Sequence, residues 1–557
     1  MTARSSKSFP GHALLQLFQP IDHEVHSRCA AEYSDREGEH GLLFFLEGGV
    51  LKPLTVLLTA AWLCATSFGG TTPTVTVGAG ALAGTKVGTV EIFKGIPYAA
   101  PPVGPLRWAP PAPPASWNGA RDASAFGAIC PQPPRPETAL AAEEDRRQSE
   151  DCLFLNVWTF EGAKKAPVMV WIHGGAFRFG SGSGRAYDGG DFARDGVVLV
   201  TINYRLGALG FFAHPALTQA AAADAPLGNY GILDQIAALQ WVQRNIAAFG
   251  GDPANVTVFG ESAGGTSVLT LLSLPAAKGL FAKAIVESGG GWRERRTLAE
   301  EEKAGLKLAA AAGLGAAATL PQLRALPPEK LFDLPMRLGA VGPFEDGRFI
   351  QQSATEAFAA GRILHVPLIV GSNSYEASLM KSFEIPAGPI AARVPASAKP
   401  LYAGTDEEVA AEVFTDAVMG APARWIAAQA SAGAPAYLYY FSYVPVRRRS
   451  TAPGASHGSE IPFVFGGWPD IFNRLASPEE HAMESLLHGC WVAFAKTGKP
   501  VCGDKAWPAY SAATDELMEF GAKPGPEANF RKARYDALQR ALLPRLIPGG
   551  RPPWQQP

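Results

Sequence analysis

The middle of the chain alternates short apolar runs with segments of helical periodicity. Three runs rich in β-branched residues, at 168–172, 197–204 and 256–259, are bounded by turn-forming residues such as Gly or Asp. Short, nearly continuous apolar runs of this kind are typical of buried parallel strands. Between the last two runs, apolar residues from Ile232 to Ile246 recur at helical spacing. The alternation predicts an α/β sheet.

The pattern G-x-S-x-G occurs twice, although one active site needs only one nucleophilic serine. Residues 260–264 place Ser262 between the predicted strand 256–259 and a helical pattern. This is the setting of a nucleophile elbow, whose sharp turn exposes the serine and tolerates only small neighbours. The match at 454–458 places Ser456 after no strand and before the segment IPFVF, where no helix start is expected. Ser262 is therefore the predicted nucleophile.

A base should follow this serine, because α/β hydrolases order their triad as Ser, acid, His. Four histidines follow Ser262 in the chain. His481 and His488 lie in a helical pattern, and His365 leads into an apolar strand, so structural roles are favoured for all three. His457 lies in a loop bordered by Gly and Ser, from which an imidazole can project into a site. The second serine pattern is thus interpreted as the loop that carries the base.

Several carboxylates could orient this base. Glu376 lies in a loop directly after the predicted strand 366–370. Asp346 precedes a glycine and fits a turn, and Glu345 and Glu460 are further alternatives. The residues alone leave the choice open and favour Glu376 for its position after a strand.

A glycine-rich loop, HGGAF, follows the predicted strand 168–172. Gly174 and Gly175 allow the backbone N–H groups to turn toward a ligand. We expect the oxyanion donors to be the N–H groups of Gly175 and Ala176, joined by that of Ala263. Each such donor contributes about 3 kcal/mol to stabilising the transition state. A simple turn is the alternative, because Gly pairs commonly form turns.

Longer motifs are spread from Val87 to Gly498. They include FKGIPYAAPPVGPLRW, SEDCLFLNVW, VMVWIHGGAF, NYRLGALGFF, GNYGILDQIAALQWVQRNIAAFGGDPANVTVFGESAGG, GSNSYEAS and GASHGSEIPFVFG. In these motifs the chain resembles the type B carboxylesterase/lipase family of α/β hydrolases, which is related to the cholinesterases and to bacterial p-nitrobenzyl-type esterases. The resemblance implies one α/β-hydrolase domain over 68–557, with a mostly parallel central sheet, flanking helices and long loop or helical insertions.

The resemblance also implies a reaction. The family motifs fall on Ser262, Glu376 and His457, which implies hydrolysis of carboxylic esters through an acyl-enzyme, without a metal or other cofactor. The implied partner is a small-molecule ester. An amidase, carbamate or lactone hydrolase could use the same triad. A non-catalytic, cholinesterase-like binding protein is a further alternative, which the presence of all three residues disfavours.

Two positions and one loop depart from the usual family pattern. Ala176 replaces a frequent third glycine and narrows the oxyanion pocket by a methyl group. Ala377 follows the acid where the family often has glycine. The loop 131–151 contains no aromatic residue, whereas cholinesterases carry a Trp there that holds a quaternary ammonium by cation–π contact. Choline esters are therefore not the expected substrates.

Cysteine usage fits an oxidising compartment. Joining Cys130 to Cys152 would close a loop of about twenty residues and contribute about 3 kcal/mol, and the first disulfide of the family falls on these two residues. Cys490 and Cys502 could pair or stay free. The His and Cys residues show no metal-binding spacing.

The segment 50–67 has the outline of a secretory signal peptide, with one lysine, about ten apolar residues, and small residues at Ala65 and Ser67. A membrane anchor at 54–64 is the alternative, although the run is short for a stable span. Residues 1–49 would then be a disordered extension or a misassigned start. The expected location is secreted or periplasmic.

Charge and composition narrow the range of partners. The net charge is −2, and the 47% apolar and 18% charged residues are ordinary for a globular protein. Basic residues form no extended cluster, so no nucleic-acid partner is expected. The sequence leaves the oligomeric state open, a monomer included.

Overall fold

The computed structural model describes residues 72–134, 147–332, 341–466 and 476–547. The predicted signal segment 50–67 and the extension 1–49 lie outside these residues. Within the described ranges, no helix combines the length and the apolar character needed to cross a membrane.

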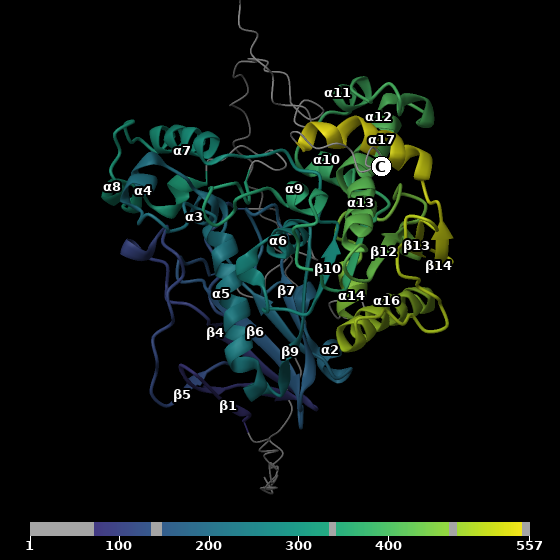
Figure 1. The fold of residues 1–557 in the computed structure, drawn as a ribbon. Coiled ribbons are helices and arrows are strands. Elements are labelled where there is room, and N and C mark those ends of the chain that lie inside the picture. The colour runs from purple at the N-terminus through teal and green to yellow at the C-terminus, as the bar shows by residue number, and fades with distance from the viewer. Residues whose placement is uncertain (1–71, 135–146, 333–340, 467–475, 548–557) are drawn as a thin grey trace, which may run out of the picture. The chain divides into compact units, whose positions relative to one another are not determined.

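An eleven-stranded sheet forms the centre of the described residues (Figure 1). The seven neighbouring strands in its middle are parallel: β7 to β13 of the chain, which run in space from β13 at one side to β8 at the other. Antiparallel strands extend the sheet at both edges. The predicted α/β fold with a mostly parallel sheet is thereby confirmed. In spatial order the strands are β14 (Gly525–Ala528), β13 (Glu516–Phe520), β12 (Ala436–Phe441), β11 (Leu368–Asn373), β10 (Lys283–Glu287), β9 (Gly251–Glu261), β7 (Ala166–Ile172), β8 (Val198–Ile202), β6 (Phe154–Phe160), β4 (Val90–Pro97) and β3 (Thr85–Val87).

A small second sheet is built from three strands near the start of the described residues. Its order is β1 (Thr74–Val77), β2 (Gly80–Ala83) and β5 (Ala120–Asp122), with β1 antiparallel and β5 parallel to β2.

Both faces of the main sheet are buried, which explains the continuous apolar runs in the sequence. Along β7, Val168, Val170 and Ile172 pack into one core, and Met169 and Trp171 pack into the core on the opposite face. Side chains alternate between the faces of a strand, so a strand covered on both sides is apolar at every position.

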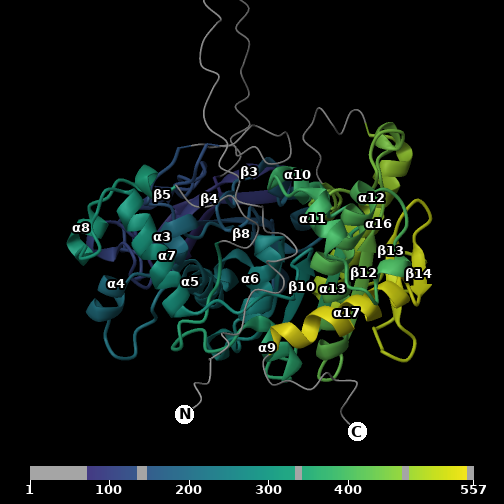
Figure 2. The same cartoon turned by 90° about the horizontal axis from the view of Figure 1, so that it is seen from above.

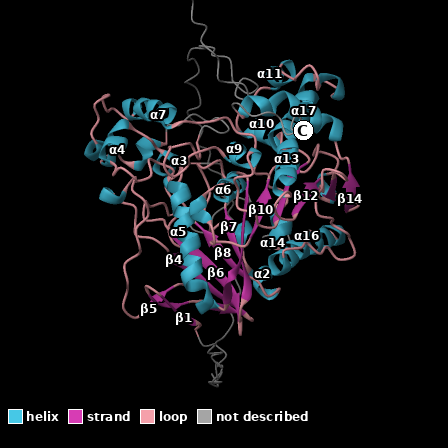
Figure 3. Cartoon of the chain, viewed as in Figure 1, coloured by secondary structure: helices cyan, strands magenta, loops and turns pink. Residues whose placement is uncertain are grey.

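Helices cover the two faces of this sheet (Figure 3). Their bounds are α2 (Gly190–Arg194), α3 (Gly207–Phe211), α4 (Pro215–Ala220), α5 (Tyr230–Asn245), α6 (Ala263–Leu272), α7 (Leu298–Ala311), α8 (Leu320–Arg324), α9 (Ala354–Ala359), α10 (Ser378–Ser382), α11 (Ala387–Ala392), α12 (Asp406–Thr415), α13 (Ala421–Ala430), α14 (Ile461–Phe465), α16 (Pro478–Thr497) and α17 (Lys532–Leu546).

The cores on the two faces of the sheet place several of these helices in two layers, while α3, α4, α7 and α8 contribute to a third, smaller core. Apolar residues of α5, α6, α13 and α17 share one core with the sheet, and residues of α2, α14 and α16 share the other. Figure 2 shows α13 beside strand β12 and α17 beside α13. The helix predicted from Ile232 to Ile246 is α5, which ends one residue earlier, at Asn245.

The segment IPFVF was not expected to begin a helix, and this prediction is wrong. It forms α14, with Pro462 in the first turn. Proline suits that position because the N–H it lacks would have no helical partner there. The buried side chains of Phe463 and Phe465 then anchor the turn in the core beside α16. As predicted, no strand leads into Ser456. Its β-type pairing is a single isolated bridge to Tyr375.

Candidate active site

Ser262 occupies the turn between β9 and α6. Its backbone angles are φ 57° and ψ −117°, a conformation that is rare for a residue with a side chain. The turn is held from both sides. The N–H of Ser262 donates to the carbonyl of Glu287 at 2.9 Å, and the N–H of Thr266 donates to the carbonyl of Ser262 at 2.8 Å. The geometry is that of a nucleophile elbow.

The two glycines of this motif are required by crowding. A Cβ on Gly264 would lie 1.9 Å from the carbonyl oxygen of Ile172, and a Cβ on Gly260 would lie 2.6 Å from the same oxygen. Both distances are far below van der Waals contact. Helix α6 therefore packs directly on the end of β7, from which the oxyanion loop continues.

His457 and Glu376 are brought together although 81 residues separate them. Nδ1 of His457 lies 2.5 Å from Oε2 of Glu376. The other carboxylate oxygen of Glu376 accepts from the N–H of Asn373 at 2.7 Å and from the hydroxyl of Ser288 at 2.6 Å. The hydroxyl of Ser378 accepts from the N–H of His457 at 3.0 Å. Both members of the pair are thus fixed by neighbours, and Glu376 is completely buried.

The alternative carboxylates have other partners. Oδ1 of Asp346 accepts the backbone N–H groups of residues 348–350, which is the turn chemistry expected for it. Glu345 forms an ion pair with Arg295 at 2.6 Å. Glu460 is buried near the triad residues, but its hydrogen-bond partner is the side chain of Asn373.

Two of the alternative histidines, His481 and His488, have structural contacts instead. His481 and His488 lie in α16, as the helical pattern predicted. His488 lies 2.7 Å from the carbonyl of Val464 through Nδ1 and forms an ion pair with Asp195 at 3.3 Å through Nε2. These contacts join α16 to its neighbours.

Glu261, which was not among the residues predicted from the sequence, faces His457. Its Oε1 lies 3.0 Å from Nε2 of His457, close enough for an ion pair but without the angles of a hydrogen bond. Among the described residues, no hydrogen bond joins Ser262 to His457. The only sign of Glu261 in the sequence was its position immediately before Ser262. The imidazole therefore lies between two carboxylates.

This arrangement favours the charged imidazolium. Burial disfavours the charge on His457, but the nearby carboxylates of Glu261 and Glu376 outweigh it, so the pKa of His457 is raised well above 6.5.

Two further acids lie behind the site. Burial, together with the nearby charge of Glu261, raises the pKa of Glu287 to about 8, although the indole N–H of Trp491 donates to it at 2.7 Å. Burial, with Glu261 and Glu287 nearby, also raises the pKa of Glu460 well above its usual value. Both shifts favour the neutral carboxyl form of Glu287 and Glu460 over the carboxylate. The described residues contain no His, Cys, Asp and Glu group suited to a metal ion.

The loop after β7 lies beside the nucleophile. A Cβ on Gly174 would lie 3.1 Å from Cβ of Ser262 and 2.6 Å from Oε2 of Glu261. Gly175, Ala176 and Phe177 all have positive φ, at 102°, 55° and 60°. This unusual backbone turns successive peptide groups of the loop in a direction that a strand or helix would not allow.

The backbone N–H groups expected to bind the oxyanion have no hydrogen-bond acceptor among the described residues. Within the described ranges, no hydrogen bond is donated by the N–H of Gly175, Ala176 or Ala263. Unpaired N–H groups are costly inside a protein unless a ligand or water meets them. These three are therefore suited to a developing negative charge.

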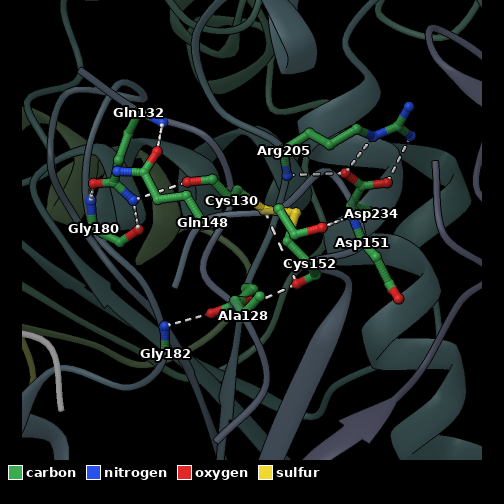
Figure 4. Close-up of a disulfide and its surroundings, with 12 residues drawn as sticks. Ala128, Cys130, Gln132, Gln148, Asp151, Cys152, Gly180, Gly182, Arg205 and Asp234 are labelled. Carbon is green, nitrogen blue, oxygen red and sulfur yellow. Dashed lines mark hydrogen bonds and ion pairs between the residues drawn. A yellow bond between two sulfur atoms is a disulfide. The ribbon is translucent and has the colours of Figure 1, made fainter. Parts of the chain in front are cut away.

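Two disulfides occur in the structure. Cys130 is bonded to Cys152 (Figure 4), and Cys490 is bonded to Cys502. The first closes the loop that precedes β6, and the second joins α16 to the segment that follows it.

Comparison with known proteins identifies the family of the chain. The model of the carboxylesterase family matches residues 71–399 and 397–538. The chain belongs to the carboxylesterase family. As a carboxylesterase of the α/β-hydrolase fold, it is a carboxylic-ester hydrolase.

Similar proteins include bacterial esterases. The para-nitrobenzyl esterase of Bacillus subtilis (strain 168) is 38% identical over 500 residues, which cover 83% of this carboxylesterase and 98% of the relative. The fumonisin B1 esterase of Sphingopyxis macrogoltabida is 38% identical over 488 residues, with 80% and 86% covered.

Solved structures show the same similarity. A PNB esterase structure matches with a TM-score of 0.75 at 35% identity, covering 84% of this carboxylesterase and 99% of that chain. A carboxylesterase of Geobacillus stearothermophilus matches with a TM-score of 0.73 at 35% identity, covering 84% and 100%.

Proposed function

We propose that this carboxylesterase hydrolyses small, uncharged carboxylic esters with Ser262 as nucleophile, His457 as general base and Glu376 as the orienting acid. The observation that carries the proposal is the 2.5 Å contact between His457 and Glu376 beside the strained turn of Ser262. An uncharged substrate is favoured because the carboxylate of Glu261 next to the nucleophile repels an anionic acyl group.

The reaction has two steps. Ser262 attacks the ester carbonyl while Nε2 of His457 takes its proton, and His457 then protonates the leaving alcohol. Water, deprotonated by the same imidazole, hydrolyses the acyl-enzyme and restores Ser262. Glu376 keeps Nδ1 protonated and stabilises the imidazolium that forms in each step.

The oxyanion of both tetrahedral intermediates is held by the N–H groups of Gly175, Ala176 and Ala263. Donors fixed before the reaction need no reorganisation when charge develops, which makes each of them worth about 3 kcal/mol. Their lack of any other hydrogen bond within the described residues supports this role.

His457 must lose a proton and its contact with Glu261 before it can act as a general base. In the free enzyme Nε2 of His457 faces Glu261, and although burial disfavours the charge, the carboxylates of Glu261 and Glu376 raise the pKa of His457 well above its usual value. A catalytic cycle therefore begins when His457 deprotonates and its Nε2 turns from Glu261 to the hydroxyl of Ser262. Activity should rise with pH through the raised pKa of His457.

The location proposed for the enzyme is outside the cytoplasm, secreted or periplasmic. The disulfides Cys130–Cys152 and Cys490–Cys502 support it, because such bonds persist in oxidising compartments. The signal-like segment 50–67 supplies the route.

The two serine patterns provide a matched test. Hydrolysis of p-nitrophenyl butyrate should fall by about 10⁴-fold or more in Ser262→Ala, and it should stay within about threefold of wild type in Ser456→Ala. His457→Ala should lose activity as Ser262→Ala does. Equal rates for wild type and Ser262→Ala would refute the proposal. A large loss in Ser456→Ala, with no loss in Ser262→Ala, would show that Ser456 and not Ser262 is the nucleophile.

A further inference from the structure

A side-chain amide from the disulfide loop clasps the end of the oxyanion loop (Figure 4). Oε1 of Gln132 accepts the N–H of Gly180 at 2.9 Å, and Nε2 of Gln132 donates to the carbonyl of Gly180 at 3.2 Å. Gln132 is only 4% exposed. Both backbone groups of one glycine are thus paired by one buried amide.

The clasped glycine closes the turn that contains two of the expected oxyanion donors, Gly175 and Ala176. The carbonyl of Gly175 accepts the N–H groups of Arg178 and Phe179 at 2.9 and 3.0 Å. A Cβ on Gly175 would lie 2.3 Å from the carbonyl oxygen of Phe179, so the two ends of the turn are in direct contact. The position of the peptide between Phe179 and Gly180 therefore determines where Gly175 lies.

The anchor on the other side is covalent. Gln132 lies two residues after Cys130, and its Nε2 also donates to the carbonyl of Cys130 at 3.1 Å. The N–H of Gln132 donates in turn to Oε1 of Gln148 at 2.9 Å. The disulfide to Cys152 holds this segment against the start of β6.

A second amide fixes the same region two residues further on. The N–H of Gly182 donates to Oδ1 of Asn203 at 2.8 Å, and Nδ2 of Asn203 donates to the carbonyls of Ala128 and Cys152 at 3.1 and 3.0 Å. The oxyanion loop is thus tied to the disulfide loop, and the clasp by Gln132 is the tie nearest to the donors.

We propose that Gln132 is a positioning residue that sets the oxyanion hole by holding Gly180. The inference rests on the proposed function, since it assigns Gly175 and Ala176 as donors. Positive φ angles at Ala176 and Phe177, which both carry side chains, store conformational strain in this loop. The pair of hydrogen bonds from Gln132 opposes its relaxation, so the donors stay aimed at the reacting carbonyl.

Only an amide satisfies both atoms of Gly180. Gln132→Met keeps the length of the side chain but leaves the N–H and the carbonyl of Gly180 unpaired. Gln132→Glu keeps the acceptor for the N–H and places a second oxygen against the carbonyls of Gly180 and Cys130. We expect kcat to fall about 10- to 100-fold in both variants, with KM changed less than about threefold, because misaligned donors act mainly on the transition state.

Gln243 provides the matched control. Its Nε2 also donates to two backbone carbonyls, those of Pro253 and Leu280, at 2.8 and 3.0 Å, but far along the chain from the oxyanion loop. Gln243→Met should cost similar thermal stability and leave kcat within about twofold of wild type.

The experiment combines kinetics with hydrogen exchange on the full-length protein. Wild type, Gln132→Met, Gln132→Glu and Gln243→Met are assayed with p-nitrophenyl butyrate for kcat and KM. Backbone amide exchange over residues 174–182 is measured on the same samples. We expect faster exchange in this segment and the selective loss of kcat in both Gln132 variants, and neither change in Gln243→Met.

Each result decides one way. Unchanged exchange over 174–182 in Gln132→Met overturns the clasp, whatever the activity. Faster exchange with an unchanged kcat overturns its role in positioning, and equal loss of kcat in Gln243→Met reduces Gln132 to a general stabilising residue. Failure of the proposed function would be seen separately, as full activity in Ser262→Ala.

Discussion

Replacing Gly264 by alanine tests how tightly the nucleophile is built onto the sheet. The new Cβ would lie 1.9 Å from the carbonyl oxygen of Ile172 and 3.1 Å from that of His173. Since real Cβ atoms keep at least 3.0 Å from such atoms, α6 and the end of β7 must separate by about 1 Å. The nucleophile starts α6 and the oxyanion loop continues from β7, so this displacement separates the attacking oxygen from the donors. A misplacement of about 1 Å can cost about 100-fold in rate, and overpacking costs about 1–3 kcal/mol of stability.

The assay for Gly264→Ala is kcat for p-nitrophenyl butyrate together with thermal unfolding followed by circular dichroism. We expect a loss of kcat of about 100-fold with most of the protein folded at 25 °C. The control is Gly489→Ala in α16, where no atom lies within 4 Å of the new Cβ; it should keep full activity and gain up to about 1 kcal/mol from helix propensity. A kcat within threefold of wild type in Gly264→Ala would refute the reasoning, because the strand and helix would then have absorbed the methyl group without moving the site.

Three further changes have defined outcomes. Glu261→Gln removes a negative charge 3.0 Å from Nε2 of His457 and should therefore lower the pKa of this imidazole. The acid limb of the pH profile of kcat/KM should then move to lower pH. A limb that stays in place or moves to higher pH would contradict this prediction. Asp234→Ala leaves Arg205 buried without its ion-pair partner at 2.7 Å and should lower the free energy of unfolding in urea by about 3–5 kcal/mol, whereas a loss below 1 kcal/mol would mean that the pair is dispensable. Cys490→Ala opens a loop of 12 residues and should cost about 3 kcal/mol under non-reducing conditions, and an unchanged urea midpoint would argue against a role for this bond.

Local sequence carried the prediction of the sheet and of the elbow because both depend on near neighbours in the chain. An apolar run marks a strand covered on two faces, and Gly260 and Gly264 mark a turn with no space for Cβ atoms. The same local reasoning failed at α14, because the apolar run after Pro462 owes its helical form to packing against α16 and the sheet.

Distant residues needed the fold. The choice of His457 came from its loop setting and that of Glu376 from its position after a strand and from family resemblance; their 2.5 Å contact depends on two loops meeting beyond the ends of separate strands. Apart from the position of Glu261 next to Ser262, nothing in the sequence indicated that Glu261 would face the imidazole or that Gln132 would hold Gly180, because glutamate and glutamine have no distinctive spacing.

The sequence by itself thus determined the α/β sheet, the nucleophile turn and a short list of candidates for base and acid. It did so because hydrophobic period and glycine position are local properties that survive in any fold of this type. The tertiary structure alone decided the partners: which carboxylates flank His457, which N–H groups remain unpaired, and which side chain braces the oxyanion loop. Charge and hydrogen bonding act through space over a few ångströms, and only the folded chain brings residues tens of positions apart within that distance.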